Sequence, residues 1–281
     1  MNNGISRDKK VLGLGDQVVD QYVNLNVMYP GGNALNFAAF ARQLGYSSAF
    51  MGVFGSDRNS QHVKDSIDLM HVDRSHCQEH EGANGCAKVN IVDGDRIFIG
   101  SNEGGVAGEY PIALQPGDLE YIGDFDLIHM GIWGHANQVL PMVSKLGVPI
   151  SYDFSDEFEI DNIDQALGYV QYGFFSLSGM MTGQIKVLLR ALFRQGTTKL
   201  LSATRGAEST IMYDGERFYE LEPKFVEAVD TMAAGDAFLT AFLLSHVLEG
   251  KSVEESMRDG QSFAGQAVQL KGSFGFEIPI E

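Results

Sequence analysis

The fold is decided in the middle of the chain, where residues 126–154 read DLIHMGIWGHANQVLPMVSKLGVPISYDF. Two apolar runs of strand length, residues 127–130 and 149–154, flank a segment that we expect to be helical. The alternation continues with apolar runs at 174–177 and 199–203. Alternating strands and helices predict an α/β fold, in which helices cover both faces of a mainly parallel sheet. Ligands then bind at the carboxyl ends of the strands, at a topological switch point.

The amino-terminal part of the chain fits the same architecture. Residues 11–15 form a short apolar run that ends at glycine, and residues 49–54 form another, so both predict buried strands. Between them, apolar side chains recur at helical spacing over residues 33–44, and Gly45 stands where a carboxyl-terminal cap belongs. The sequence therefore predicts a strand, a helix and a strand in this order.

Residues 85–100 have a different pattern. Residues 88–91 and 96–99 flank Asp93-Gly94-Asp95, which is typical of a half-exposed β-hairpin. Such an antiparallel piece is expected to form a lid over the strand ends. An α/β fold of this length often forms one domain. We predict a single domain over residues 1–281, with a lid built from about residues 17–30 and 85–102.

The composition excludes several classes of partner. The 281 residues carry 37 acidic and 20 basic side chains, a formal charge of −17, and such a field repels nucleic acid and anionic lipid. Residues 1–10 are polar and no apolar run reaches 18 residues, so neither secretion nor a membrane span is predicted. The two cysteines fit a reducing compartment. We expect a cytoplasmic protein that binds neither nucleic acid nor membrane.

Residues 71–86 contain several side chains of the metal-ligand type. No pair among them has the spacing of a known zinc motif. Two interpretations therefore stay open, a structural zinc site and a polar loop. The side chains concerned are His71, His76, Cys77, His80 and Cys86.

The strongest signal for phosphate chemistry lies at residues 230–236, which read DTMAAGD directly before an apolar helix at 237–248. The two common glycine-rich nucleotide motifs are absent. Small residues allow a close approach to a ligand, and the first N–H groups of a helix lack partners within it. Ala233, Ala234 and Gly235 therefore predict an anion hole. Asp236 in the first turn can accept the proton of an attacking hydroxyl, although an aspartate there can also merely cap a core helix.

The segment 230–236 resembles the D-T-x-G-A-G-D signature of the PfkB, or ribokinase-like, carbohydrate kinases. Residues 30–36, PGGNALN, are similar to the family's G-G-x-x-x-N segment. Residues 204–206, TRG, resemble its T-x-G turn, and residues 52–57, GVFGSD, its G-x-x-G-x-D turn. These motifs cover nearly the whole chain in the expected order. By resemblance, the chain is identified as a member of that family.

The resemblance implies ATP-dependent phosphorylation of a sugar hydroxyl, with Asp236 as the base. Sugar hydroxyls would be bound by Asp20, Gly32 and Asn36. Mg²⁺ would accompany the ATP phosphates. A monovalent cation, K⁺, near Asp230 and Gly272 is left open. The ATP phosphates would contact Thr204, Arg205, Gly206 and Thr231.

Within the family the likeness is closest to bacterial fructoselysine 6-kinases. It rests on residues 128–136, IHMGIWGHA, on residues 152–156, YDFSD, and on residues 95–98, DRIF. Trp133 and Arg96 are therefore expected to contact the substrate, although Trp133 could instead be a packing residue. Two alternatives stay open. One is another PfkB kinase, of the fructokinase, ribokinase, nucleoside or 2-keto-3-deoxygluconate type, and the other is a catalytically weak sugar-binding descendant.

The sequence departs from the family pattern at three places. Ala233 stands where many relatives have glycine, which matters if that residue needs a positive φ. The family's N-x-x-E element, which organises metal-bound water, has no counterpart in residues 178–184, SGMMTGQ, so no protein ligand for a metal can be named. Arg205 replaces an apolar residue and could either reach a phosphate or be a solvated surface side chain. A lid with exposed strand edges also predicts pairing with a second copy of the chain.

Overall fold

The computed structural model describes residues 8–92, 95–156, 163–164, 166–193 and 197–280. Its main sheet has the order β13-β12-β11-β10-β9-β8-β1-β4-β5. The first two strands of this order are antiparallel to their neighbours, and the other pairs are parallel. The strands are β1 (Lys10–Gly15), β4 (Ser47–Phe54), β5 (Gln78–Glu79), β8 (Leu127–Gly131), β9 (Ile150–Asp153), β10 (Tyr172–Ser176), β11 (Leu200–Thr204), β12 (Thr210–Tyr213) and β13 (Phe218–Leu221).

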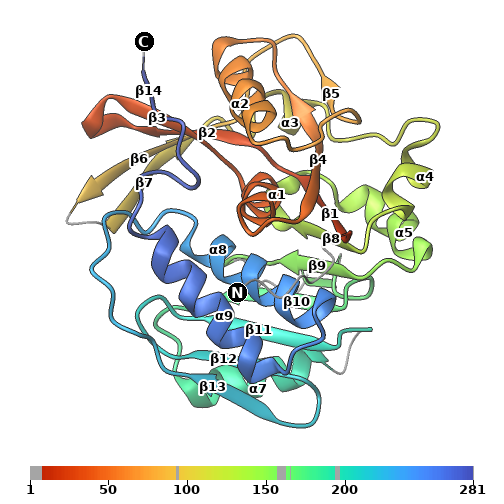
Figure 1. Cartoon of the computed structure of the whole chain (residues 1–281), viewed down its shortest axis with the longest axis vertical. Coiled ribbons are helices and arrows are strands. Elements are labelled where there is room, and N and C mark those ends of the chain that lie inside the picture. The colour runs from red at the N-terminus through yellow and green to blue at the C-terminus, as the bar shows by residue number, and fades with distance from the viewer. Residues whose placement is uncertain (1–7, 93–94, 157–162, 165, 194–196, 281) are drawn as a thin grey trace.

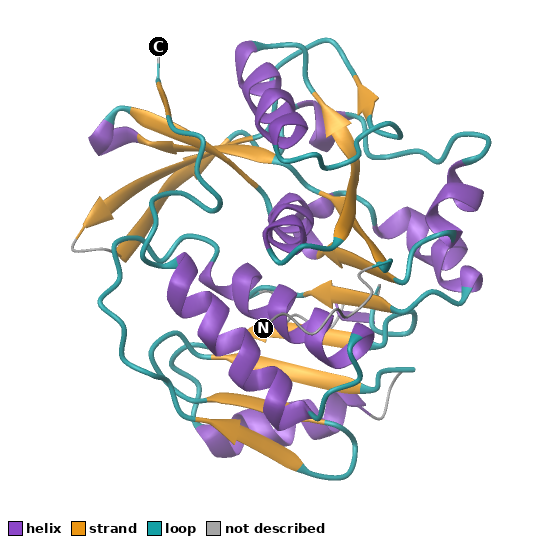
Figure 2. Ribbon diagram, viewed as in Figure 1, coloured by secondary structure: helices purple, strands orange, loops and turns teal. Residues whose placement is uncertain are grey.

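Helices cover both faces of this sheet, as Figures 1 and 2 show. One apolar cluster joins alternate strand residues such as Leu127 to α1 (Asn33–Gln43), α8 (Ala234–Leu243) and α9 (Val253–Ala267). The other cluster joins the intervening residues, such as Ile128, to the helices on the opposite face. These are α4 (Asp118–Gly123), α5 (Leu140–Val143) and α7 (Thr182–Phe193).

A second, smaller sheet projects to one side of the main sheet, at the upper left of Figure 1. Its order is β14-β3-β2-β6-β7, and only the central β2–β6 pair is parallel. The hairpin expected around residues 88–99 forms β6 and β7, and its turn at 93–94 lies outside the described residues. The strands are β2 (Val18–Tyr22), β3 (Val27–Gly31), β6 (Cys86–Val92), β7 (Asp95–Ser101) and β14 (Ile278–Pro279).

The remaining segments are mostly short. They are α2 (Arg58–Leu69), α3 (Val106–Glu109), the 3-10 turns η1 (Val23–Leu25), η2 (Ile132–Gly134), η3 (Asn137–Val139) and η4 (Ser144–Leu146), and a π-helical segment η5 (Leu244–Leu248). Within the described ranges, no helix combines the length and the apolar character that crossing a membrane would require.

The predicted fold class is confirmed, with differences at some element ends. The helix expected from residue 237 begins at Ala234, and its last turn at Leu244–Leu248 is π-helical. The strand expected at 174–177 spans Tyr172–Ser176. The strands β5, β12, β13 and β14 were not predicted. β5 and β14 have two residues each, which carry no periodic signal. The earlier start of α8 places Asp236 as the third residue of the helix, close to its unbonded amides.

Candidate active site

The amino-terminal ends of α1 and α8 meet at the carboxyl ends of the central strands. Asp236 lies in the first turn of α8 and is partly exposed. Its carboxylate accepts two hydrogen bonds from α1: Asn33 Nδ2 donates to Oδ1 at 2.9 Å, and Asn36 Nδ2 donates to Oδ2 at 2.6 Å. Two amide donors fix the direction of the carboxylate and favour its ionised form.

The other atoms of Asn33 and Asn36 extend this network in different ways. Asn33 Nδ2 also donates to Asp153 Oδ2 at 2.9 Å, so one amide group bridges two carboxylates. Asn36 is 4% exposed, and its Oδ1 has no hydrogen-bond partner among the described groups. A buried oxygen without a donor is costly unless a ligand supplies one. A hydroxyl-bearing ligand beside Asp236 fits this requirement.

Asp20 on β2 is 5% exposed and packs against the glycine pair that opens α1. A Cβ on Gly31 would lie 2.1 Å from Asp20 Oδ2, so only glycine leaves room for this carboxylate. Gly32 has φ of +109°, and a Cβ there would lie 2.7 Å from Gln17 Cα. The positive φ and the backbone contacts of Gly32 require glycine there, and a side chain at Gly31 would displace the Asp20 carboxylate.

Several carboxylates gather here with little compensating charge. Burial is the main reason that the pKa of Asp20 and of Asp153 is raised to about 7, and the charge of Asp236 contributes in the same direction. Burial also raises the pKa of Asp236, while the donors Asn36 and Asn33 and the charge of Arg96 lower it. Arg96 on β7 likewise opposes the shift of Asp20. The second sheet thus brings one cation toward an acidic centre.

The predicted anion hole lies at the start of α8. Ala233 precedes the helix in the left-handed region, with φ of +55° and ψ of +18°. The backbone N–H groups of Gly235 and Asp236 have no backbone partner among the described residues. Such N–H groups and the helix dipole favour an anion. Thr231, half-buried, stands two residues before Ala233.

Asp230 holds this loop in place. Its Oδ1 accepts from Met232 N at 2.9 Å, and its Oδ2 accepts from Tyr22 Oη at 2.7 Å and from Gly272 N at 2.8 Å. The carboxylate is 1% exposed. Three donors from the anion loop, β2 and the carboxyl-terminal segment are therefore joined at one buried side chain.

The turn after β11 corrects one expectation. Arg205 is 9% exposed, so it is no solvated surface side chain. Its guanidinium donates to Met180 O at 3.1 Å and to Thr182 Oγ1 at 3.3 Å, and it pairs with Glu208. Arg205 thereby ties the turn to the segment that replaces the N-x-x-E element. Thr204 Oγ1 donates to Phe175 O at 3.3 Å.

Three further predicted residues lie on the surface. Trp133, in η2 directly after β8, is 54% exposed, which does not fit a packing role. Gly206 is exposed and has φ of +62°, which suits a tight turn. Arg96 is also exposed, and its Nη1 contacts Met232 Sδ at 3.1 Å.

The side chains of residues 71–86 do not converge on one point. Cys77 Sγ donates to Phe50 O at 3.2 Å, His76 Nδ1 lies 2.7 Å from Asp118 Oδ1, and the ring of His80 stacks on Tyr110. In the part of the chain that is described, no group of three or more His, Cys, Asp or Glu side chains is arranged to hold a metal. The contacts observed are those of a packed polar loop.

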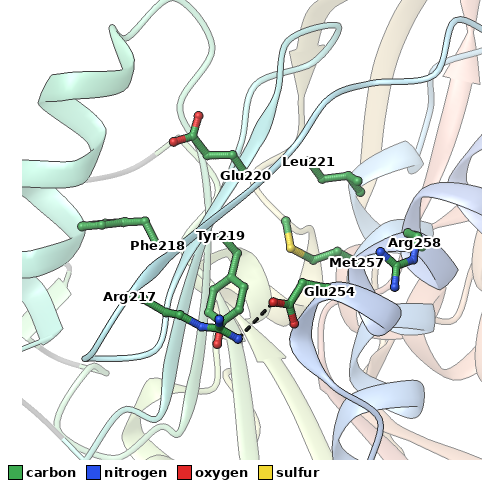
Figure 3. A pocket seen from close by; sticks show the side chains of 8 residues that line it. All are labelled: Arg217, Phe218, Tyr219, Glu220, Leu221, Glu254, Met257 and Arg258. Atoms are coloured by element: carbon green, nitrogen blue, oxygen red, sulfur yellow. Dashed lines mark hydrogen bonds and ion pairs between the residues drawn. The ribbon is translucent and has the colours of Figure 1, made fainter.

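A pocket elsewhere on the molecule is lined by β13 and α9, as Figure 3 shows. Arg217 pairs there with Glu254 at 3.0 Å and lies over the ring of Tyr219. None of the predicted site residues lines it. The predicted residues Asn36 and Asp236 meet instead at the start of α1 and α8.

Residues 4–277 match the pfkB family carbohydrate kinases. The chain belongs to this family. The fructosamine kinase FrlD of Bacillus subtilis is 33% identical over 271 residues, which cover 96% of this chain and 94% of that protein. The fructoselysine 6-kinase of Escherichia coli is 28% identical, covering 95% of this chain and 100% of that protein. The predicted family and its activity, an ATP-dependent sugar kinase, are confirmed.

Solved structures agree on the fold. Ribokinase of Arabidopsis thaliana, complexed with ribose and ATP, superposes with a TM-score of 0.79 at 22% identity. The alignment covers 95% of this chain and 94% of that chain. Ribokinase of Giardia lamblia superposes with a TM-score of 0.82 at 14% identity, covering 97% of each chain.

Three site residues were missed by the sequence analysis. Asn33, Asp153 and His129 belong to the network around Asp236. A signal existed for each. Asn33 follows the glycine pair, Asp153 stands near the end of a predicted strand, and His129 is a polar residue inside an apolar run. None of these signals says which other residue the side chain meets.

The strained residue before α8 yields a prediction about stability. Ala233→Gly removes a Cβ from a left-handed residue, where a side chain costs roughly 1 kcal/mol. We expect this variant to be more stable in urea unfolding by some tenths to about 1 kcal/mol. The matched control is Ala234→Gly, in the helical first position, which should lose stability. Equal losses of stability in the two variants would contradict backbone strain at Ala233.

The buried Asp20 yields a prediction about pH. Unfolded, its pKa returns to about 3.9, whereas in the folded chain it is about 7. The folded state therefore binds more protons between these values, and stability falls as the pH rises through this window. The free energy of unfolding of Asp20→Asn, relative to that of the wild type, should increase by about 1 kcal/mol or more from the acid end to the neutral end of this pH window. Urea unfolding at a series of pH values measures this. Asp124→Asn, at an exposed carboxylate, should leave the slope unchanged.

Proposed function

We propose that this enzyme transfers the γ-phosphate of ATP to a hydroxyl of a fructosamine, with the 6-hydroxyl of fructoselysine as the first candidate. The observation that carries the proposal is the Asp236 carboxylate, which two amides of α1 hold beside the unbonded N–H groups of α8. Support for the substrate class comes from the two relatives whose names state it.

The proposed chemistry follows from this arrangement. Asp236 accepts the proton of the attacking hydroxyl as the oxygen approaches the γ-phosphorus. The anion hole of Ala233, Ala234 and Gly235 stabilises the charge on the transferring group. The second sheet acts as a lid that excludes water and so limits ATP hydrolysis.

The sugar is proposed to lie between the second sheet and the start of α1. Asp20 and the unsatisfied Oδ1 of Asn36 accept bonds from its hydroxyl groups, and Gly32 allows a close approach. Arg96 from β7 and the exposed ring of Trp133 complete the walls. A fructosamine carries an ammonium group, and an acidic centre favours a cationic ligand.

ATP is proposed to lie along the turn of Thr204 and Gly206, toward Thr231, with Arg205 fixing the turn from beneath. The first helical N–H groups of α8 suit a phosphate.

Mg²⁺ would bind together with the ATP phosphates, because it keeps several waters and needs few protein ligands. A K⁺ ion near Asp230 stays a prediction, and both oxygens of that carboxylate already accept hydrogen bonds. Replacing K⁺ by tetramethylammonium in the assay checks it.

Another PfkB sugar or nucleoside kinase is the second candidate, because the catalytic loop does not depend on the identity of the sugar. The left-handed Ala233 and the missing N-x-x-E element favour, more weakly, a sugar-binding protein with little turnover. The assay below separates these three functions.

A second copy of the chain is the proposed partner of the lid. β7 is the last strand in the order of the second sheet, and Ile97, Phe98 and Ile99 on it are each half or more exposed. An open edge with apolar side chains favours pairing. Sedimentation of the full chain at a series of concentrations would show a monomer throughout if this proposal is wrong.

A cytoplasmic location is proposed as well, because ATP-dependent sugar kinase activity fits it.

Asp236→Asn keeps the shape of the side chain and removes the proton acceptor. The turnover number should fall by about 10² or more while ATP binding persists, as measured by coupled assay and by calorimetry. Asp124→Asn serves as the control and should retain the wild-type rate. Full activity of Asp236→Asn would remove the assigned base.

The same assay ranks the substrates. Fructoselysine should exceed fructose, ribose and 2-keto-3-deoxygluconate in kcat/KM. A wide margin in favour of free fructose or ribose would replace the fructosamine by the second candidate function. If no sugar is phosphorylated, the sugar-binding protein with little turnover is the candidate function that remains.

A further inference from the structure

A chain of hydrogen bonds leads from the interior of the main sheet to Asp236. His129 lies on β8 and is 0% exposed, and Ser151 is its register partner on β9. His129 Nδ1 lies 2.8 Å from Ser151 Oγ, and His129 Nε2 lies 2.9 Å from Asn33 Oδ1. Asn33 then contacts the carboxylates of Asp153 and Asp236. Asn33 and Asp236 thus link the ring to the hydroxyl that is proposed to react.

The network allows one assignment of its hydrogens. Asn33 uses both hydrogens of its amide nitrogen on Asp153 and Asp236, so its oxygen faces the ring and needs a donor. His129 Nε2 must therefore carry the hydrogen. Its Nδ1 is then an acceptor, and it takes the hydroxyl hydrogen of Ser151 at 2.8 Å in preference to Ile128 O, which lies 3.2 Å from the same hydroxyl. The opposite tautomer would place a ring lone pair against the oxygen of Asn33.

The surroundings keep His129 neutral and in place. Burial lowers its pKa to about 3. Its ring packs on Phe37 of α1, with the centroids 4.8 Å apart. The groups that contact it come from α1 and β9, and none of them titrates: Asn33, Phe37 and Ser151. The imidazole is therefore a fixed donor over the working pH range.

We propose that His129 is a positioning residue, whose Nε2–H fixes the Asn33 carboxamide in the orientation that presents both amide hydrogens to Asp236 and Asp153. The proposal rests on the proposed role of Asp236 as the base. Without this donor the two acids alone orient the carboxamide, and it can turn over when Asp153, whose pKa is about 7, carries a proton that its oxygen can accept. Asp236 then loses a donor that favours its ionised form, and a larger share of the enzyme holds a protonated base.

The charged groups around Asp236 stay the same when His129 is changed. They are Asp16 before β2, Asp20 on β2, Arg96 on β7 and Asp153 on β9. A shift in the titration of the base can therefore be assigned to the turned carboxamide. A purely structural role of His129 would lower the stability or the active fraction, and it would leave the pH profile where it is.

The test compares two replacements of His129. His129→Phe keeps an aromatic ring against Phe37 and removes the donor, whereas His129→Gln has a side-chain N–H that can reach the place of Nε2. In His129→Phe the acid limb of kcat/KM should move to higher pH by about one unit, since a hydrogen bond to a charged group is worth about this much. At a pH on the acid side of both limbs the rate should fall roughly tenfold, with KM for ATP unchanged. His129→Gln should return the limb toward the wild-type position.

A matched control is His246→Phe. This second histidine also stacks on a phenylalanine, Phe242, and it lies outside the site. Its replacement should leave the acid limb of kcat/KM at the wild-type position if the proposal holds. An unmoved limb in His129→Phe, or equal shifts in His129→Phe and His129→Gln, would overturn the proposal.

Two further measurements keep the outcome decisive. If His129→Phe does not fold, Ser151→Ala, which removes the donor to Nδ1, should move the limb in the same direction by less. ¹⁵N-histidine spectra of the wild type should show the Nε2-protonated tautomer without titration between roughly pH 5 and 8. Observation of the Nδ1-protonated tautomer would refute the hydrogen bond from His129 Nε2 to Asn33. Full activity of Asp236→Asn would instead refute the base itself, so the two failures can be told apart.

Discussion

The rest of the site depends on the two hydrogen bonds that α1 donates to the Asp236 carboxylate. A carboxylate in a shallow, largely dehydrated position is costly unless donors replace the lost water. Asn33 and Asn36 supply these donors from one helical face, three residues apart. The arrangement requires α1 and α8 to meet at their amino-terminal ends. The packing of the two helices on the same face of the sheet therefore has a direct chemical consequence.

The anion loop is joined to the second sheet through Asp230. This buried side chain links the loop before α8 to Tyr22 on β2 and to Gly272 near the carboxyl terminus. The carboxyl-terminal strand β14 then pairs with β3. A movement of the second sheet would consequently pull on the loop that is proposed to hold the phosphates. The proposed sugar site under the sheet and the proposed anion hole are thus linked by the three hydrogen bonds that Asp230 accepts.

The departures from the family pattern find local explanations. Arg205 holds the segment that replaces the N-x-x-E element through Met180 O and Thr182 Oγ1, so this segment is ordered by a side chain from the neighbouring turn. Ala233 adopts the left-handed conformation that suits glycine better, and the strain is stored beside the proposed phosphate site. Neither feature removes the proposed base, Asp236, or the backbone N–H groups at the start of α8.

The sequence by itself determined the parallel strands β1, β4, β8, β9, β10 and β11 of the main sheet, and it pointed to the loop before α8 and to Asp236. Each of these rests on a local pattern: apolar runs, helical spacing, or small residues before a helix. It also pointed to Asp20, Gly32 and Asn36, through their resemblance to family motifs. Only the tertiary structure decided the partners of Asn33, which lie 120 and 203 positions away in the chain. The same holds for His129. Hydrogen bonds over such separations leave no periodic trace in a single sequence, since they depend on which strand ends and helix ends meet.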